Sequence, residues 1–283
     1  MPAKIIDGKA LANEVYHELA GRVKRLGSRG IIPCIAIICI GEDELDKRRV
    51  ALKENAAMKL GMESVTYCLR QDVTQERVVE LIKKLNADEN IHGIIVQTPM
   101  PDQLDVKAVL ESIDPEKDLD GLHFCNAGKL LNGDPAIVAC TPRAIIRIID
   151  SIGMDIQAKH TVVVGKSVLV GRPIAVCLLN RNATVSVCHT KTTNLAEITR
   201  NADILVVAAG SPALIKEDMV KEGAVVIDVG QTSVDGHLRG DVDFEAVSQK
   251  AGYITKTVGG VGPMTVAMLM ANLVDCAENL TKE

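Results

Sequence analysis

Apolar positions in the first half of the chain alternate between helical spacing and short continuous runs of the buried-strand type. Helical spacing predicts three helices, at residues 7–25, 47–60 and 73–85. Continuous runs predict strands at 31–40 and 91–97. Gly61 is the expected C-cap of the second helix, and Asp72 or Thr74 is the expected N-cap of the third.

The second half of the chain contains several short apolar runs. The runs begin at Val162, Ala183, Asp203 and Ala224, and helical stretches separate them. Runs this apolar are typical of parallel strands that are covered on both faces. Apolar residues within 264–280 have helical spacing and predict a C-terminal helix packed on one face. The pattern therefore predicts an α/β fold with a parallel sheet.

Composition adds bounds to this prediction. The 283 residues suit two cores, which at 47% hydrophobic but only 2% aromatic content are built from aliphatic side chains. A net charge of −5 gives no reason to expect nucleic acid or an anionic membrane as partner. No apolar run has membrane-spanning length, and the first residues do not resemble a signal peptide. The eight cysteines are scattered without a C-x-x-C pair, which predicts reduced, buried thiols in a cytoplasmic protein and no metal site.

A glycine loop in the second half has the form of a phosphate site. The run Val162–Val164 ends at Gly165, and Pro173 stands where a helix would begin. Such a loop aims backbone N–H groups and a helix N-terminus at one point, which favours a phosphate. The spacing is not G-x-G-x-x-G, so a plain turn is an equal alternative for the loop alone. Thr190, Gly210 and Gly230 follow the next runs, and strand ends of this kind cluster in dinucleotide-binding domains.

The residue after the second run bears on which dinucleotide is bound. NAD-binding domains carry an acidic residue about 20 residues past the glycine loop, where it binds the ribose 2′-hydroxyl. This chain has Lys191 in that region, flanked by hydroxyl side chains. A cation suits a 2′-phosphate, so NADP is favoured, with NAD as the alternative. A solvated loop lysine is the structural alternative.

Three segments of the first half could carry chemistry. Arg49 and Lys53 are four residues apart and share a helix face. The run 96–101 ends a strand in Gln97 and two prolines, and 114–123 is an acidic loop. Each has a structural alternative: a solvated basic face, a stiff turn and a surface connection.

Taken together, these segments resemble the bifunctional methylenetetrahydrofolate dehydrogenase/methenyltetrahydrofolate cyclohydrolase family, often called FolD. The resemblance covers nearly the whole chain, and its most diagnostic motif is 259–265. The matching motifs are 96–101, 115–121, 140–142, 164–167, 170–173 and 259–265.

The resemblance implies two reactions. Hydride passes from 5,10-methylenetetrahydrofolate to NADP, and water then opens the methenyl cation to 10-formyltetrahydrofolate. Lys53 matches the catalytic lysine, Gln97 the glutamine that orients it and Asp120 the aspartate that holds the pterin. A lysine that works as a base near neutral pH needs a depressed pKa, which burial or a nearby cation supplies.

The resemblance also implies two sets of binding residues. The expected folate contacts are Arg49, Val258, Gly259, Gly260, Val261, Gly262 and Pro263. The expected cofactor contacts are Gly165, Lys166, Ser167, Gly171, Thr190, Lys191 and Gln231. It further implies a homodimer, a substrate domain of residues 1–140 with 263–283, a Rossmann-like dinucleotide domain of residues 141–262, and an active site in the cleft between them.

The chain departs from the family pattern at several positions near the expected site. Arg49 stands where a tyrosine usually stacks on the folate, and Lys166 replaces an arginine. Further replaced segments are 44–46, 231–232 and 256–258. A guanidinium can also stack on a flat ring, and Arg49 would place a cation one turn from Lys53 that lowers the pKa of its amine.

These departures leave two other functions open. One is a dehydrogenase that lacks hydrolase activity or acts on another pterin. The other is a non-catalytic protein that binds folate or nucleotide. The presence of Lys53, Gln97 and Asp120 argues against lost hydrolysis. Lys53 also argues against the non-catalytic protein, whereas the altered tyrosine and proline positions favour it.

Overall fold

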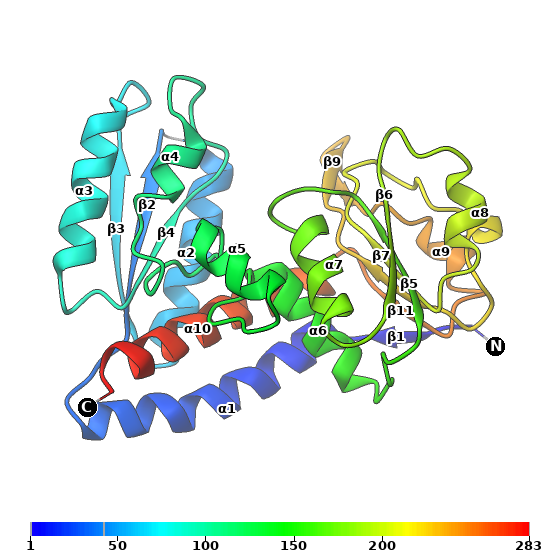
Figure 1. Cartoon of the computed structure of the whole chain (residues 1–283), viewed down its shortest axis with the longest axis horizontal. Helices are drawn as coiled ribbons and strands as arrows, with labels where there is room; N and C mark the ends of the chain where they lie inside the picture. Colours follow the sequence, from blue (N-terminus) through cyan, green and yellow to red (C-terminus); the bar gives the residue numbers. More distant parts are fainter. Residues whose placement is uncertain (1, 42, 283) are drawn as a thin grey trace. The chain divides into compact units, whose positions relative to one another are not determined.

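The computed structural model describes residues 2–41 and 43–282, apart from the side chains of 44–46. The chain divides into two compact units. Residues 1–13 and 141–265 form one, here called the six-stranded unit, and residues 14–140 and 266–283 form the other, the three-stranded unit. The boundaries fall within helices α1 (Gly8–Ser28) and α10 (Val261–Leu280), and just after the first residue of α6 (Cys140–Ser151) (Figure 1).

The six-stranded unit contains the predicted parallel sheet. Its strands run in the order β1-β11-β8-β7-β5-β6, and each neighbouring pair is parallel. The central strands β5, β7 and β8 are almost wholly apolar and buried, as expected for strands covered on both faces. The strands are β1 (Lys4–Ile6), β5 (His160–Val164), β6 (Thr184–Cys188), β7 (Ile204–Val207), β8 (Val225–Asp228) and β11 (Tyr253–Thr255).

Shorter elements complete this unit. Residues 232–239 form an antiparallel hairpin outside the main sheet. The hairpin strands are β9 (Thr232–Val234) and β10 (His237–Arg239), and the helices are α7 (Gly171–Leu179), α8 (Leu195–Thr199), the 3-10 helix η1 (Glu217–Met219) and α9 (Phe244–Val247).

The three-stranded unit has a small parallel sheet in the order β3-β2-β4. Helix α3 covers one face, where its buried residues Val78, Ile82 and Leu85 pack with the core of β2 and β4. Helix α2 lies against the other face and is joined to β3 by a hydrogen bond of 2.5 Å from Thr66 to Glu54. The elements are β2 (Cys34–Ile40), α2 (Glu44–Lys59), β3 (Glu63–Leu69), α3 (Gln75–Ala87), β4 (Gly93–Val96), α4 (Val106–Leu110) and α5 (Phe124–Leu131).

The parallel-sheet α/β fold predicted from the apolar pattern is confirmed, with shifts at element ends. The strand predicted at 31–40 begins only at Cys34, because Pro33 has no N–H to donate and the N–H of Ile31 closes the end of α1. Helix α10 begins at Val261, three residues before the predicted start. Thr74, one of the two expected caps, accepts the N–H of Arg77 at the start of α3.

Two expectations differ from the structure. Strand β1, which the predicted division placed with residues 1–140, pairs with β11 in the sheet of the six-stranded unit. The eight cysteines were expected to be buried, but Cys68 and Cys125 are exposed. No disulfide joins cysteines in the described part of the chain. Among the same residues, no helix is long and apolar enough to cross a membrane.

A buried lysine closes the end of helix α3. The Nζ of Lys117 donates to the carbonyl oxygens of Leu85, Asn86 and Asp88 at 3.3, 2.8 and 2.8 Å. The last carbonyls of a helix have no partner within the helix, and a cation there also opposes the negative end of the helix dipole. Lys117 therefore joins the loop that carries residues 114–123 to α3.

We predict that Lys117→Met lowers the free energy of unfolding by about 2–3 kcal/mol, because three carbonyl oxygens lose a charged donor. Urea unfolding followed by circular dichroism measures the change. Lys83→Met, which alters an exposed lysine on helix α3, is the matched control and is expected to leave stability unchanged. Equal stability of the two variants would show that the Lys117 contacts contribute little.

Candidate active site

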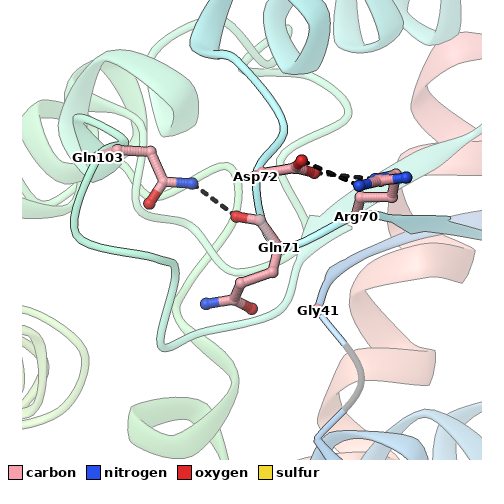
Figure 2. A pocket seen from close by; sticks show the side chains of 5 residues that line it. All are labelled: Gly41, Arg70, Gln71, Asp72 and Gln103. Carbon is pink, nitrogen blue, oxygen red and sulfur yellow. Dashed lines mark hydrogen bonds and ion pairs between the residues drawn. The ribbon is translucent and has the colours of Figure 1, made fainter.

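The carboxyl edge of the three-stranded sheet is open to solvent. A surface cavity of about 780 Å³ lies there, lined by Gly41 directly after β2, by Arg70, Gln71 and Asp72 after β3, and by Gln103 (Figure 2). Gln103 donates to the backbone carbonyl of Gln71 at 2.6 Å. Arg70 pairs with Asp72, but both side chains are so exposed that the pair contributes little. These residues lie outside the predicted site.

Lys53 and Gln97 meet at the same edge of this sheet. Lys53 lies on α2, and Gln97 directly follows β4. The Nζ of Lys53 donates to Oε1 of Gln97 at 2.5 Å, and the Gln97 side chain is buried. The structure thus brings together two residues that are 44 positions apart in the sequence and that the resemblance pairs.

The surroundings of Lys53 hold the pKa of its amine below the ordinary value. Burial is the main cause, since it disfavours the charged form, and the guanidinium of Arg49 one turn away acts in the same direction. Asp120, Cys140 and Cys39 oppose this change. Arg49 itself is exposed and donates to the backbone carbonyl of Thr98 at 3.4 Å.

Asp120 is placed by a strand-like segment beside β4. Asp118 forms a parallel bridge with Ile94, and the N–H of Leu119 donates to the Ile94 carbonyl at 3.3 Å. Asp120 therefore lies toward the same carboxyl edge that carries Gln97. Gly93 is needed for this approach, because a Cβ there would lie 2.5 Å from the Leu119 side chain.

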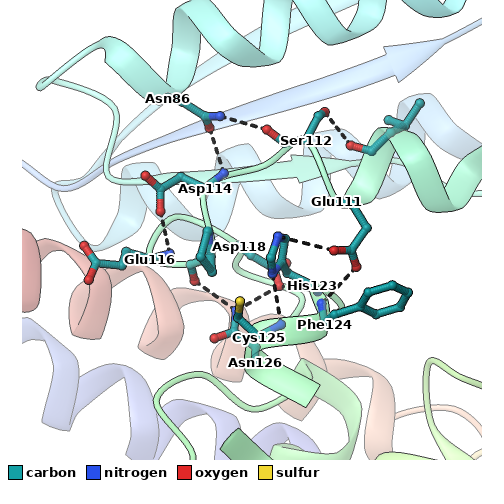
Figure 3. Close-up of polar contacts among 12 residues, drawn as sticks. Asn86, Glu111, Ser112, Asp114, Glu116, Asp118, His123, Phe124, Cys125 and Asn126 are labelled. Atoms are coloured by element: carbon teal, nitrogen blue, oxygen red, sulfur yellow. Dashed lines mark hydrogen bonds and ion pairs between the residues drawn. The ribbon is translucent and has the colours of Figure 1, made fainter. Parts of the chain in front are cut away.

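A network of polar contacts fixes the loop that contains Asp118 and His123 (Figure 3). The buried carboxylate of Asp118 accepts the N–H of His123 at 2.8 Å and the side-chain amide of Asn126 at 3.0 Å. Asn126 also donates to the carbonyl of Pro115 at 2.9 Å. Glu111 accepts the N–H of Phe124 at 2.9 Å. The acidic loop 114–123 is thus an internally bonded support and not a plain surface connection.

The carboxyl group of Asp120 titrates far above its ordinary range. Burial, followed by the neighbouring carboxylate of Asp118, raises the pKa of Asp120 to about 6. The ammonium of Lys53 and a hydrogen bond from the Cys140 thiol act in the opposite direction. Two groups at this edge, Lys53 and Asp120, therefore have pKa values displaced toward neutrality, as is common in catalytic sites.

The glycine loop of the six-stranded unit has the backbone geometry that was expected of a phosphate site. Gly165 has φ of +122°, and a Cβ there would lie 2.1 Å from the carbonyl oxygen of Ala208. A Cβ at Gly171 would lie 2.1 Å from the Gly165 carbonyl. Only glycines fit this cradle, which leads into the N-terminus of α7, so the loop fits the phosphates of a dinucleotide.

The side chains of the loop differ in their availability. Lys166 is exposed, whereas the Ser167 hydroxyl accepts the N–H groups of Val170 and Gly171 at 3.2 and 3.3 Å and so caps the start of α7. Thr190 and Lys191 are exposed in the loop after β6, and the N–H of Lys191 donates to the ring of His189.

Two buried carboxylates that the sequence reading did not single out hold the neighbouring loops of this sheet. Asp228, at the end of β8, accepts the N–H groups of Gly230 and Asp241, each at 3.0 Å. Asp241 accepts the N–H groups of Ala209 and Gly210 at 2.6 and 2.8 Å. Burial raises the pKa of Asp228 to about 6. The oxygens of these carboxylates thus accept hydrogen bonds from loop N–H groups at the edge of the six-stranded sheet where Gly165 and Thr190 lie.

The segment 256–263 also belongs to the six-stranded unit and lies on the start of α1. Gly8 and Gly260 approach so closely that a Cβ at Gly8 would lie 1.8 Å from the Gly260 carbonyl oxygen. Gln231 donates to the carbonyl of Thr257 at 3.0 Å, and Val258 is exposed. Val261, Gly262 and Pro263 form the first turn of α10. The structure thus places the side chain of Gln231 beside this segment.

The side chains of Glu44, Leu45 and Asp46, one of the replaced segments, lie outside the described residues. Within the described residues no group of three or more His, Cys, Asp or Glu side chains has the arrangement of a metal site. Cys140 was not predicted as a site residue, although it lies in the motif 140–142. That motif is the signal from which its contact with Asp120 could have been suspected.

Comparison with known proteins identifies the family. Residues 6–120 match the model of the tetrahydrofolate dehydrogenase/cyclohydrolase catalytic domain, and residues 139–281 match that of the corresponding NAD(P)-binding domain. The chain is 52% identical over 273 residues to the bifunctional protein FolD of Halothermothrix orenii, covering 96% of each chain.

Solved structures agree. The bifunctional FolD enzyme of Campylobacter jejuni has a TM-score of 0.97 at 44% identity, with 98% of this chain and 99% of that chain covered. The Trypanosoma brucei FolD, solved with NADP and an inhibitor, has a TM-score of 0.96 at 38% identity and full coverage of both chains. This chain therefore belongs to the tetrahydrofolate dehydrogenase/cyclohydrolase family.

Proposed function

We propose that this protein oxidises 5,10-methylenetetrahydrofolate to the methenyl cation with NADP and hydrolyses that cation to 10-formyltetrahydrofolate. The observation that carries the proposal is the 2.5 Å hydrogen bond from Lys53 to Gln97, made by an amine with a lowered pKa beside Asp120. A dehydrogenase alone has no need of a base that is poised to accept a proton from water.

Lys53 is the proton acceptor of the hydrolytic step. Water attacks the carbon that bridges N5 and N10 of the cation, and the neutral amine takes the proton that this water loses. The bond between that carbon and N5 then breaks as the proton of the added hydroxyl passes to N5, so that the carbon remains on N10 as a formyl group and N5 leaves as a neutral amine. Gln97 accepts a hydrogen bond from the amine and so fixes the direction of its lone pair.

Asp120 binds the pterin. A pterin ring presents N–H groups at its pyrimidine edge, and a carboxylate accepts two such bonds in the plane of the ring. Because the pKa of Asp120 is about 6, this acceptor is ionised at neutral pH and becomes a carboxylic acid below it. Weaker folate binding below pH 6 follows from this assignment.

The six-stranded unit binds the cofactor, which supplies the hydride acceptor when bound. The loop from Gly165 to Gly171 receives the phosphates, and the exposed cations Lys166 and Lys191 favour the 2′-phosphate of NADP over the hydroxyl of NAD. We propose the six-stranded unit, which contains residues 141–262, as the dinucleotide domain and the three-stranded unit as the substrate domain, with 258–263 and Arg49 contributing to folate binding.

We also propose that the protein is a homodimer, as the family resemblance implies, which sedimentation of the purified protein tests. We propose that it acts in the cytoplasm, which cysteines scattered without a C-x-x-C pair indicate.

We predict that the purified protein reduces NADP with 5,10-methylenetetrahydrofolate and yields a product that absorbs as the methenyl form only after acid treatment. Lys53→Met is expected to lower the hydrolysis of added methenyltetrahydrofolate by about a hundredfold or more. Methenyl product that accumulates without acid in the unaltered protein would leave a dehydrogenase alone. Failure to reduce either NADP or NAD would overturn the folate assignment.

We predict that Arg49→Tyr moves the rising limb of the pH–rate profile for hydrolysis to higher pH. Arg49 lowers the pKa of Lys53, so its removal raises that pKa and leaves less neutral amine at pH 7. Arg48→Tyr changes the adjacent exposed arginine and is the matched control. An unchanged profile would deny Arg49 an electrostatic role.

We predict that Lys166→Ala and Lys191→Ala each raise the KM for NADP about tenfold, because each removes a charged contact to the 2′-phosphate. The KM for NAD, which lacks this phosphate, is the internal control and should stay constant. A variant that raises both KM values equally would place its lysine on a part of the cofactor that NAD and NADP share.

A further inference from the structure

Asn272 is a buried polar side chain on an otherwise apolar stretch of α10. Its neighbour Leu273 is also fully buried, and Asn272 itself is only 1% exposed. Burying an amide is unfavourable unless its hydrogens find acceptors. The Nδ2 of Asn272 donates to the carbonyl oxygens of Leu119 at 2.8 Å and Val138 at 2.9 Å. Both carbonyls belong to segments next to Asp120 and Cys140.

The same amide nitrogen lies 3.6 Å from the sulfur of Cys140. That sulfur is in turn 3.3 Å from the Leu119 carbonyl oxygen and 3.7 Å from Oδ1 of Asp120. A thiol has a single proton, so Cys140 can donate fully to only one of these two oxygens. The Leu119 carbonyl oxygen has two lone pairs and can accept from both the amide of Asn272 and the thiol. Because the amide also donates to the sulfur, Asn272 ties Cys140 to the backbone that precedes Asp120.

We propose that Asn272 is a positioning residue that bonds the Leu119 and Val138 carbonyls and the Cys140 sulfur, and so holds the thiol within reach of the carboxylate of Asp120. Asn272 does not itself reach Asp120; it acts through Cys140 and through the backbone that precedes Asp120. The inference rests on the proposed function, in which Asp120 holds the pterin. It adds α10, in the part after residue 265, to the elements that set the chemistry of the site.

The charged and titratable groups that face Asp120 give the direction of the effect. Asp118 raises the pKa of Asp120, whereas Lys53 and the Cys140 hydrogen bond lower it. If Asn272 is lost, its amide no longer ties the sulfur of Cys140 to the Leu119 and Val138 carbonyls, and the Asp120 carboxylate loses the positioned thiol as a donor. Its pKa then rises above about 6, and less carboxylate is present to accept the pterin N–H groups at neutral pH.

The test is Asn272→Leu, which removes the donors while keeping a similar volume. The acid limb of the kcat/KM profile for 5,10-methylenetetrahydrofolate should move to higher pH, and KM at neutral pH should rise about fivefold, as expected for one hydrogen bond. Cys140→Ala should move the limb in the same direction without altering α10. In the Cys140→Ala background, Asn272→Leu should produce no additional movement.

Asn86→Leu is the matched control. Asn86 also bridges two backbone segments of this unit, because it donates to the Ser112 carbonyl at 2.8 Å and accepts the N–H of Asp114 at 3.0 Å. It should lower the urea midpoint and leave the acid limb in place.

Two results would overturn the inference: an acid limb that stays in place in both Asn272→Leu and Cys140→Ala, or effects of the two changes that simply add. Asp120→Asn separates these from failure of the proposed function. A raised KM in Asp120→Asn with an unmoved limb in Asn272→Leu removes only the role of Asn272. An unaltered KM in Asp120→Asn removes the assignment of Asp120 itself.

Discussion

A lysine amine can accept a proton near neutral pH only when its charged form is disfavoured, and burial of Lys53 against Gln97 meets this condition. The rest of the three-stranded unit follows from that requirement. Helix α2 must lie on one face of the sheet, where the bond from Thr66 to Glu54 helps to hold it. Strand β4 must end where an amide oxygen can meet the amine, and the segment that carries Asp120 must pair beside β4.

This arrangement places a cost on stability. The folded state holds a proton on Asp120 more tightly than the unfolded chain does, because its pKa is raised from 3.8 to about 6. Between these values the folded state binds more protons, so the contribution of Asp120 to stability falls as the pH rises and stays unfavourable above pH 6. The adjacent carboxylate of Asp118 adds to this cost, yet its hydrogen bonds to His123 and Asn126 hold the turn. Asp120 binds the pterin in its ionised form. The site therefore works in the pH range in which Asp120 lowers the stability of the fold.

Sequence reasoning predicted most of the long elements, because their apolar spacing reports burial directly. It did not single out β3, whose residues Glu63, Ser64 and Thr66 give no apolar run on an edge strand, or β11, which is only three residues long. Lys53, Gln97 and Asp120 were predicted through the family motifs, but their meeting depends on pairing between distant segments. The roles of Asn272 and Asp241 were not foreseen, since a single buried amide or carboxylate leaves no periodic signal.

The departures from the family pattern lie where the fold tolerates them. Arg49, Lys166 and Gln231 have exposed side chains, so their replacement disturbs no core packing. The groups that hold the binding loops are of another kind: Asp118 in one unit, and Asp228 and Asp241 in the other, are buried carboxylates that accept backbone N–H groups. Loops at the carboxyl edge of a sheet lack ladder partners, and unsatisfied N–H groups there are costly. Evolution can therefore alter the charges that face folate and cofactor while these acceptors keep the loops in place.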